Sequence, residues 1–357
     1  MLSIYKLDTE EGLNSYKELL KKLNSANPYY SIDYINFFSG GLPNLICFSF
    51  NPRKDEIILM PGYLKPIVID NIESVYFDFI STYGYSGPTS TLGVNKLDFK
   101  NFWRVLDEWY KENNVVTEFI RFNLFGNQIE YSGNSFPTML NIKGQIQDEN
   151  TQWNSFDYKV RKNYNKAIRE NLKSEIYFNN IKQDQISEFY DIYKTTMDRN
   201  GAKESFFYSF SEFKKFIIKN EENCAICTVY HNEIPISSEL ILVSQDTIYS
   251  FLGGTLSNYF DKRPNDFLKV QVINWARNNG KKYFVLGGGY GFEDGIFKYK
   301  KAFFPNDVVN YFTGRKIINN DAYIELIKTA NSYRVISNLE ILDINDVSFF
   351  PLYNKLN

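Results

Sequence analysis

Residues 247–289 decide the fold of this chain, and they read TIYSFLGGTLSNYFDKRPNDFLKVQVINWARNNGKKYFVLGGG. A β-rich run at 247–252 ends in two glycines, and a second β-rich run at 282–286 ends in three. Between them, residues 264–279 carry apolar side chains at steps of three and four, which predicts an amphipathic helix. Pro264 suits the first turn of that helix. Strand, helix and strand in this order predict an α/β crossover unit.

A hairpin is expected just before this unit, from β-rich runs at 224–230 and 235–243. The turn between them holds His231, the one histidine of the chain. A Ser-His-Asp or Cys-His hydrolase would have to use this residue, whereas a turn position favours a solvated, uninvolved side chain. Cys224 and Cys227 have metal or redox spacing, but residues three apart on a strand face opposite sides. The sequence therefore predicts no metal site and no nucleophilic triad.

The first half of the chain shows the same order of elements about 170 residues earlier. It has a hairpin at 44–60, a strand at 75–80, a glycine loop at 82–88, a helix at 98–113 and a strand at 116–124. The polar stretch 150–155 fits a connection between the two halves. We therefore expect two α/β (α+β) domains, residues 1–150 and 151–357. Each should have a mixed, largely antiparallel sheet flanked by helices.

Composition excludes several classes of protein. The 357 residues are 43% hydrophobic and 23% charged, which is typical of a globular protein. The formal net charge of −2 gives no overall basic field that would attract nucleic acid. Three cysteines are too few for a disulfide framework. The first residues do not form a signal peptide, and no run approaches the ~18 apolar residues of a spanning helix. We expect a cytoplasmic protein of unknown oligomeric state.

Four local motifs follow one another on the duplicated pattern. They are YGYSGP at 83–88, RKNYNKA at 161–167, MDRNGA at 197–202, and LGGG at 286–289 with DGIFKYKKAF at 294–303. In this order they resemble the motifs of the Fem-type (FemAB-like) peptidoglycan-bridge transferases and of the wider GNAT acetyltransferase-like superfamily. The resemblance covers residues 83–304 and implies tandem GNAT-like domains.

The resemblance also implies an acyltransferase. Such an enzyme moves an acyl or aminoacyl group from acyl-CoA, acetyl-CoA included, or from aminoacyl-tRNA. The acceptor would be an amino group of a cell-envelope or polysaccharide precursor, an amino sugar or a peptide. The reaction needs a neutral amine, a stabilised oxyanion and a neutralised leaving group, but no covalent intermediate and no metal.

Three residues are implied in catalysis: Lys300, Asp294 and Tyr85. Lys300 matches the lysine of the family's F-K-x-x-F signature, and its ammonium would neutralise charge on the acyl carbonyl or on a phosphate-bearing donor. Alternatively, Lys300 belongs to a solvated cluster with its lysine neighbours, Asp294 only caps a helix, and the tyrosines only pack. The residues implied in substrate binding are Tyr83, Gly84, Arg161, Asn163, Lys166, Arg199, Arg263, Asn265, Gly287, Gly288, Gly289 and Lys298.

Two departures from the family bear on the substrates. The chain lacks the long helical arm of members that extend peptidoglycan. It also lacks the glycines of the GNAT pyrophosphate loop, where residues 263–268 read RPNDFL. The expected helix at 157–170 carries a basic stripe, formed by Lys159, Lys162, Lys166 and Arg169, that could hold phosphates or tRNA. Most charged helix faces, however, are only solvated. A non-catalytic binding module that keeps the fold but has lost its donor site is therefore the alternative function.

Overall fold

A computed structural model describes residues 1–23 and 27–355 of the chain. The chain forms two compact units. Among the described residues, unit 1 holds 1–23, 38–138 and 311–355, and unit 2 holds 27–37 and 139–310. Neither unit coincides with the halves 1–150 and 151–357, because the end of the chain returns to unit 1. The chain passes from one unit to the other inside β7 and again inside β13.

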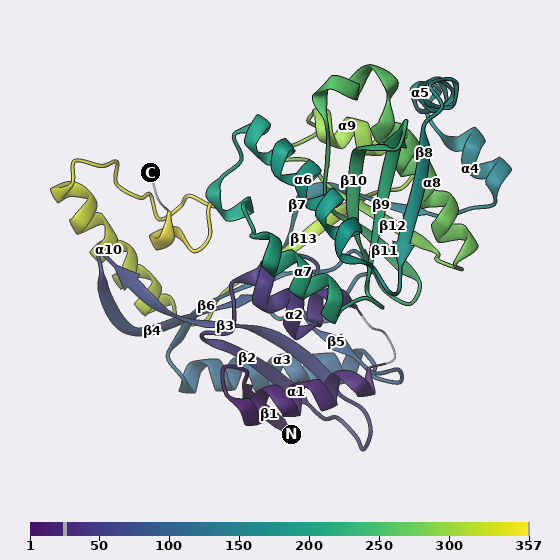
Figure 1. Cartoon of the computed structure of the whole chain (residues 1–357). Helices are drawn as coiled ribbons and strands as arrows, with labels where there is room; N and C mark the ends of the chain where they lie inside the picture. Colours follow the sequence, from purple (N-terminus) through teal and green to yellow (C-terminus); the bar gives the residue numbers. More distant parts are fainter. Residues whose placement is uncertain (24–26, 356–357) are drawn as a thin grey trace. The chain divides into compact units, whose positions relative to one another are not determined.

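Unit 1 is a mixed sheet in the order β1-β2-β3-β4-β6-β13, and Figure 1 shows its strands and helices in the sequence colours. The strands are β1 Leu2–Lys6, β2 Leu45–Phe50, β3 Ile58–Ile69, β4 Ile72–Ser81, β6 Val115–Arg121 and β13 Val308–Ile317, with the short β5 Thr89–Ser90 paired to β3. The helices are α1 Glu10–Lys22, α3 Lys96–Glu112 and α10 Asn320–Ile336.

The strands of unit 2 follow one another in the order β7-β12-β11-β10-β9-β8, in parallel and antiparallel pairs. Its strands are β7 Asn134–Gln145, β8 Lys173–Phe178, β9 Cys224–His231, β10 Ile234–Val243, β11 Thr247–Thr255 and β12 Tyr283–Gly287. Its helices are α2 Ile32–Tyr34, α4 Glu149–Ser155, α5 Tyr158–Arg169, α6 Gln183–Asn200, α7 Phe210–Lys219, α8 Pro264–Asn278 and α9 Gly295–Lys301.

The two units share one topology. In unit 1, β2, β3 and β4 form an antiparallel meander, and β4 then pairs in parallel with β6 after the crossover helix α3. In unit 2, β9, β10 and β11 form the meander, and β11 pairs in parallel with β12 after α8. The fold class and the duplication expected from the sequence are therefore confirmed.

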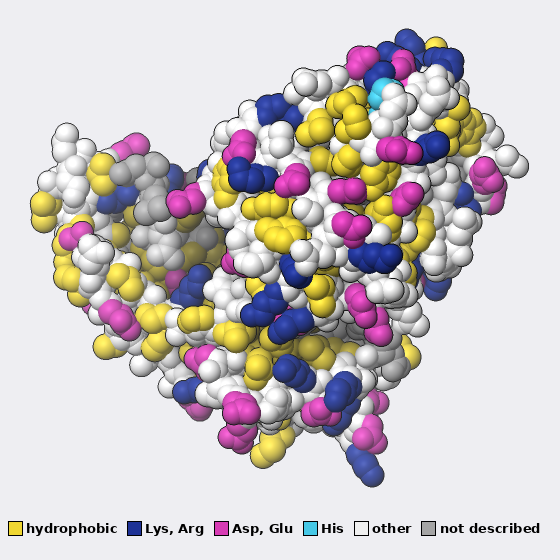
Figure 2. Space-filling model, in the orientation of Figure 1, with side chains coloured by type: hydrophobic (Ala, Val, Ile, Leu, Met, Phe, Trp, Pro, Cys, Tyr) yellow, Lys and Arg dark blue, Asp and Glu magenta, His cyan; other side chains and the backbone are white. Residues whose placement is uncertain are grey.

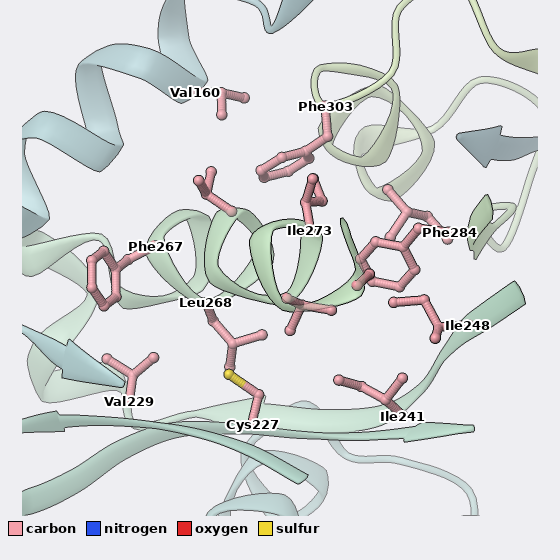
Figure 3. Close-up of a cluster of buried hydrophobic side chains, with 14 of the residues drawn as sticks. Val160, Cys227, Val229, Ile241, Ile248, Phe267, Leu268, Ile273, Phe284 and Phe303 are labelled. Carbon is pink, nitrogen blue, oxygen red and sulfur yellow. The ribbon is translucent and has the colours of Figure 1, made fainter. Parts of the chain in front are cut away.

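Helices cover both faces of the central strands in each unit, so these strands are buried on both sides. In unit 1, α3 packs on one face with a core of large aromatics that includes Phe102 and Trp103. The other face of β3 and β6 is covered by α10 and the C-terminal segment around Tyr353. In unit 2, α8 and α5 cover the face that carries Cys227, Ile241 and Phe284, as Figure 3 shows for α8, and α6 covers the other.

The sequence misplaces the glycine pair of β11. The sequence pattern places Gly253 and Gly254 after the strand, but they lie within β11 and pair with Glu239 and Ser238. A Cβ at Gly254 would stand 2.3 Å from Oγ1 of Thr196 and 2.7 Å from the Ile192 carbonyl oxygen of α6. The glycine therefore allows α6 to lie close against the strand, and it does not make a turn.

We expect Gly254→Ala to destabilise the protein by about 1–3 kcal/mol, the usual cost of overpacking a tight core. The measurement is urea unfolding followed by circular dichroism. Gly295→Ala is the matched control, because nothing lies within 4 Å of its Cβ position. Equal unfolding midpoints for the two variants would contradict the close approach of α6.

Candidate active site in unit 2

The parallel pair of unit 2 separates after three residues. The ladder joins Thr247 to Tyr283 and ends where Tyr249 meets Val285. Beyond that point β11 stays with β10, while Gly287 of β12 pairs with β7. A bulge places Phe251 as an extra residue of β11 between Ser250 and Leu252. Diverging carboxyl ends of parallel strands are where open α/β sheets bind ligands, so this edge of unit 2 is the natural place for a site.

The glycine turn that follows β12 is held by Lys300. Gly287 has a φ of 74°, and a Cβ at Gly288 would stand 2.8 Å from the Leu140 carbonyl oxygen of β7. Lys300 reaches back from α9, and its Nζ donates to the Gly288 carbonyl at 2.6 Å. Burial, and then the charge of Lys269, lower the pKa of Lys300 to about 8. An ammonium is thus fixed at the carboxyl end of β12, whereas Lys298 is exposed.

Asp294 caps α9. Its carboxylate accepts from the Phe297 N–H at 2.8 Å, and from the N–H groups of Tyr290 at 2.6 Å and Gly291 at 3.1 Å. These backbone donors, the Phe297 N–H first, lower the pKa of Asp294. A carboxylate with a lowered pKa is a weak base at neutral pH. Asp294 therefore caps α9 and also holds the loop at Tyr290 and Gly291 that precedes the helix. A catalytic role for Asp294 stays a prediction.

Removing this cap should loosen the loop. Because the pKa of Asp294 is lowered in the folded protein, its contribution is present above the unfolded carboxyl pKa and is lost as the pH falls through the folded value. We expect Asp294→Ala to speed amide exchange at Tyr290, Gly291 and Phe297, measured by hydrogen–deuterium exchange at neutral pH. Asp294→Asn keeps an oxygen acceptor and should have a smaller effect. Unchanged exchange in Asp294→Ala would contradict the cap.

The start of α8 differs from a phosphate-binding turn. Arg263 is left-handed, with a φ of 62°, and Pro264 at the first helical position has no N–H to offer. Asp266 lies in the first turn and accepts from Nδ2 of Asn163 at 3.1 Å, and burial raises its pKa. A helix start that lacks one donor and carries a carboxylate is poorly suited to pyrophosphate. Arg263 and Asn265 are both exposed there.

Three other predicted substrate-binding residues lie in unit 2, and two of them make side-chain hydrogen bonds there. Nη1 of Arg161 donates to the carbonyl oxygens of Asn154, at 3.2 Å, and of Phe156, so Arg161 closes the end of α4. Nη1 of Arg199 donates to the Thr255 carbonyl at 2.7 Å and so ties α6 to the end of β11. Lys166 is partly buried on α5. These contacts order the edges of the unit, and ligand binding by the three residues stays a prediction.

Tyr83, Gly84 and Tyr85 lie in unit 1, in the loop after β4. Tyr83 is 57% exposed, and the Tyr311 hydroxyl donates to the Gly84 carbonyl at 3.2 Å. The ring centroids of Tyr85 and Tyr311 are 5.8 Å apart. The loop therefore lies at the carboxyl ends of the parallel pair β4–β6, the same place in its unit as the glycine turn after β12.

One buried polar cluster was not predicted from the sequence. It consists of Glu239, Ser250 and Lys269 in the core of unit 2. Its signal was a charged residue within each of two apolar runs, SSELILV and FLKVQVI. Within residues 1–23 and 27–355, no group of histidine, cysteine and carboxylate side chains could hold a metal ion. Over the same ranges, no helix combines the length and apolar character needed to cross a bilayer.

Comparisons with known proteins agree on the fold. Residues 158–301, which contain β11, α8, the glycine turn and Lys300, match the model of the acetyltransferase (GNAT) domain family. No curated protein sequence matches the chain. Among solved structures, FemX superposes with a TM-score of 0.62 at 11% identity, over 87% of this chain and 97% of its own.

Two further structures show the same fold. The C-terminal domain of a putative lysylphosphatidylglycerol synthetase from Agrobacterium fabrum has a TM-score of 0.54 at 10% identity, over 88% of this chain and 95% of its own. L-PGS from Bacillus licheniformis has a TM-score of 0.52 at 12% identity, over 87% and 94%. The chain thus has the fold of GNAT-type acyltransferases. It shares this fold with FemX, as its motifs predict.

Proposed function

We propose that the chain is an acyltransferase. It would transfer an acyl or aminoacyl group from acyl-CoA or aminoacyl-tRNA to an amino group of a cell-envelope precursor, an amino sugar or a peptide. The observation that carries the proposal is the Lys300 ammonium, fixed 2.6 Å from the Gly288 carbonyl oxygen where the parallel strands of the GNAT-matched segment separate.

The proposed mechanism needs few groups. The acceptor amine, in its neutral form, attacks the acyl carbonyl, a C–N bond forms, and the bond to the sulfur or oxygen of the donor breaks. Lys300 stabilises the negative charge that develops on the carbonyl oxygen or on the leaving group. The amine proton leaves with the donor's sulfur or oxygen or passes to water. No covalent enzyme intermediate is required, in keeping with three buried cysteines whose pKa values are raised by burial.

The envelope acceptor is supported by the neighbours in fold, two of which are named for lysylphosphatidylglycerol synthesis. The choice of donor is less constrained. Pro264 and Asp266 at the start of α8 argue against the standard pyrophosphate-binding loop. The donor would then be either a CoA ester bound in another way or an aminoacyl-tRNA. On the face shown in Figure 2, acidic and basic side chains are interspersed, so tRNA binding would depend on a local patch such as the basic stripe of α5.

The alternative is a binding module with a degraded donor site, and the same two residues at the start of α8 are the observation that favours it. A donor screen separates the two functions. Thermal unfolding is followed with acetyl-CoA, longer acyl-CoAs and charged tRNA, and any donor that stabilises the protein is then tested for single-turnover transfer to amine acceptors. Stabilisation without transfer to any acceptor would favour the binding module, and transfer would establish the enzyme.

A further inference from the structure

A buried polar cluster lies beside the bulge of β11 in unit 2. Lys269 of α8 forms an ion pair with Glu239 of β10, and both side chains are 7% exposed. The Lys269 Nζ also donates to the Ser250 hydroxyl of β11 at 2.8 Å, and that hydroxyl donates to Glu239. Ser250 directly precedes Phe251, the extra residue of the bulge. The cluster therefore ties α8 and β10 to β11 at the point where the pairing of β11 shifts.

The surroundings of the cluster are apolar. The Lys269 Nζ lies 5.5 Å from the centre of the Phe284 ring, which belongs to the core shown in Figure 3. Burying two charges in such a core is costly, and a well-packed hydrophobic pair is often as stable or more stable. Among the residues that the structure describes, the second carboxylate oxygen of Glu239 also has no hydrogen-bond partner. Stability of the fold alone therefore does not account for the cluster.

The bulge decides which side chains of β11 face α8. Ser250, before the bulge, faces α8 through its hydrogen bond with the cluster. After the bulge, Leu252 pairs with Leu240, and Gly253 pairs with Glu239. Paired residues share a face of the sheet, and successive residues alternate between the faces. Leu252 therefore faces away from α8, and the residue opposite Glu239 is a glycine without a side chain.

A register without the bulge would place Leu252 opposite Glu239, because a one-residue slip turns every later side chain to the other face. An apolar side chain would then lie against the charged pair on the α8 side. In the observed backbone even a Cβ at Gly253 would stand 2.7 Å from the Ser238 carbonyl oxygen and 3.2 Å from the Cα of Glu239. The cluster therefore fits the bulged register and conflicts with the slipped one.

Packing of α6 on the other face does not select the register. The helix requires a glycine at Gly254, where a Cβ would stand 2.3 Å from Oγ1 of Thr196. A one-residue slip would bring Gly253 to that face instead, since the two glycines are adjacent. Either register thus provides α6 with a glycine, and the cluster on the α8 face distinguishes them.

The register of β11 matters for the candidate site. The parallel ladder with β12 ends at Tyr249, and the bulge at Phe251 follows. A bulge bends its strand and increases the local twist, and beside an active site it re-aims the residues that follow. The bulged register therefore helps to turn the end of β11 away from β12, whose own end carries the glycine turn held by Lys300.

We infer that Glu239 and Lys269 are positioning residues. The cluster that they form with Ser250 holds β11 in its bulged register and thereby keeps β11 and β12 apart at the candidate site. Neither side chain needs to contact substrate for this role. The inference rests on the proposed function only in giving that separation a catalytic meaning.

The first experiment reads the register by NMR and needs no donor. In protein with isotope-labelled methyl groups, the bulged register predicts a nuclear Overhauser effect (NOE) between Leu240 and Leu252, because Cβ atoms of opposite residues lie about 5 Å apart. Glu239→Leu/Lys269→Met replaces the ion pair by apolar side chains and should fold. We expect this double variant to lose most of the NOE and to gain one between Leu252 and the side chain at position 239.

Two controls accompany the double variant. Val243 and Ile248 pair before the bulge, so their NOE should persist in either register and shows that β10 and β11 still form a sheet. Lys316→Met/Glu118→Gln removes a buried ion pair from unit 1 and should leave the contact between the two leucines unchanged. It controls for the general effect of removing buried charges.

A milder variant covers the case in which the double variant does not fold. Ser250→Ala removes the hydrogen bonds between β11 and the cluster and leaves the ion pair in place. We expect amide hydrogen–deuterium exchange to become about fivefold faster in residues 251–254, the usual effect of one lost buried hydrogen bond on local opening. Exchange in residues 247–249, before the bulge, should stay unchanged.

A wild-type NOE between Leu240 and Leu252 in the folded double variant would overturn the inference, and so would unchanged exchange after the bulge in Ser250→Ala. If the double variant has slipped but transfers acyl groups at the wild-type rate, the positioning role is wrong. Failure of the donor screen would remove the proposed reaction and leave the result on the register standing.

Discussion

Lys300→Met should lower the single-turnover rate of acyl transfer by about a hundred-fold or more, which is the usual effect of removing one preorganised electrostatic contact. Methionine keeps most of the bulk of the side chain and removes only the ammonium that donates to the Gly288 carbonyl. Folding and ground-state binding of the donor should therefore survive better than turnover. The measurement is the rate at saturating donor and acceptor, once the screen has identified them.

The neighbouring lysines are internal controls for this prediction. Only residues three or four apart share a helix face, and Lys298 is exposed where Lys300 is partly buried. Lys298→Met and Lys301→Met should thus cost much less than Lys300→Met. A rate for Lys300→Met equal to that of the wild type would rule out the proposed role, and equal losses in all three variants would indicate a general effect of the basic cluster.

The pH profile provides a second readout of Lys300. Its pKa is lowered to about 8, so the fraction that is charged falls as the pH rises through that value. If the ammonium is required, the transfer rate should fall above about pH 8 in the wild type. Lys300→Met should lack this falling limb, and a limb that persists in the variant would have to come from another group.

Much of the fold could be predicted because its local signals are strong. The apolar stripe of α8 and the β-rich runs on either side of it define the crossover unit of unit 2. In unit 1, the apolar stripe at residues 98–113 likewise predicts the crossover helix α3. The capping box of α7, between Ser209 and Glu212, is present as its spacing predicts. The turn at Asn232 and Glu233 makes His231 the end of a hairpin strand.

The closing strands could not be predicted, because their partners are distant in sequence. The strand next to β6 is β13, and the strand next to β12 is β7, so in each unit a distant segment closes the sheet. The β7 sequence contains a proline and leaves half its side chains exposed, which weakens any period-two pattern. Boundaries drawn from contiguous sequence therefore cannot describe these units.

The candidate site shows the same division between local and distant information. The glycine turn, Lys300 and Asp294 lie within one continuous segment, so a motif could point to them. The buried pair of Glu239 and Lys269 joins residues 30 apart on different elements. A lone charge in an apolar run carries no sign of which opposite charge will meet it, and only the packing of α8 on the sheet brings the two together.

Unit 1 contains a comparable buried pair, and we expect Lys316→Met to destabilise the protein by about 3–5 kcal/mol, the usual cost of leaving one buried charge alone. The Lys316 Nζ lies 3.0 Å from Oε1 of Glu118, whose side chain is fully buried. Glu118 also accepts from the hydroxyls of Tyr110 at 2.7 Å and Tyr131 at 2.9 Å. Those bonds remain in the variant, but no cation then balances the carboxylate.

The second substitution tests the cause. In Lys316→Met/Glu118→Gln both buried charges are absent, and an amide oxygen can still accept from the tyrosine hydroxyls. Asp107, which also pairs with Lys316, keeps its charge but is partly exposed to solvent. Most of the lost stability should therefore return. Lys21→Met is the exposed control. The side chains of Lys21 and Glu18, which form an ion pair, are 71% and 68% exposed, and ion pairs at such positions contribute little to stability. Urea unfolding measures all three. If the double variant is as unstable as Lys316→Met alone, the loss comes from packing of the long lysine side chain and not from the unpaired charge of Glu118.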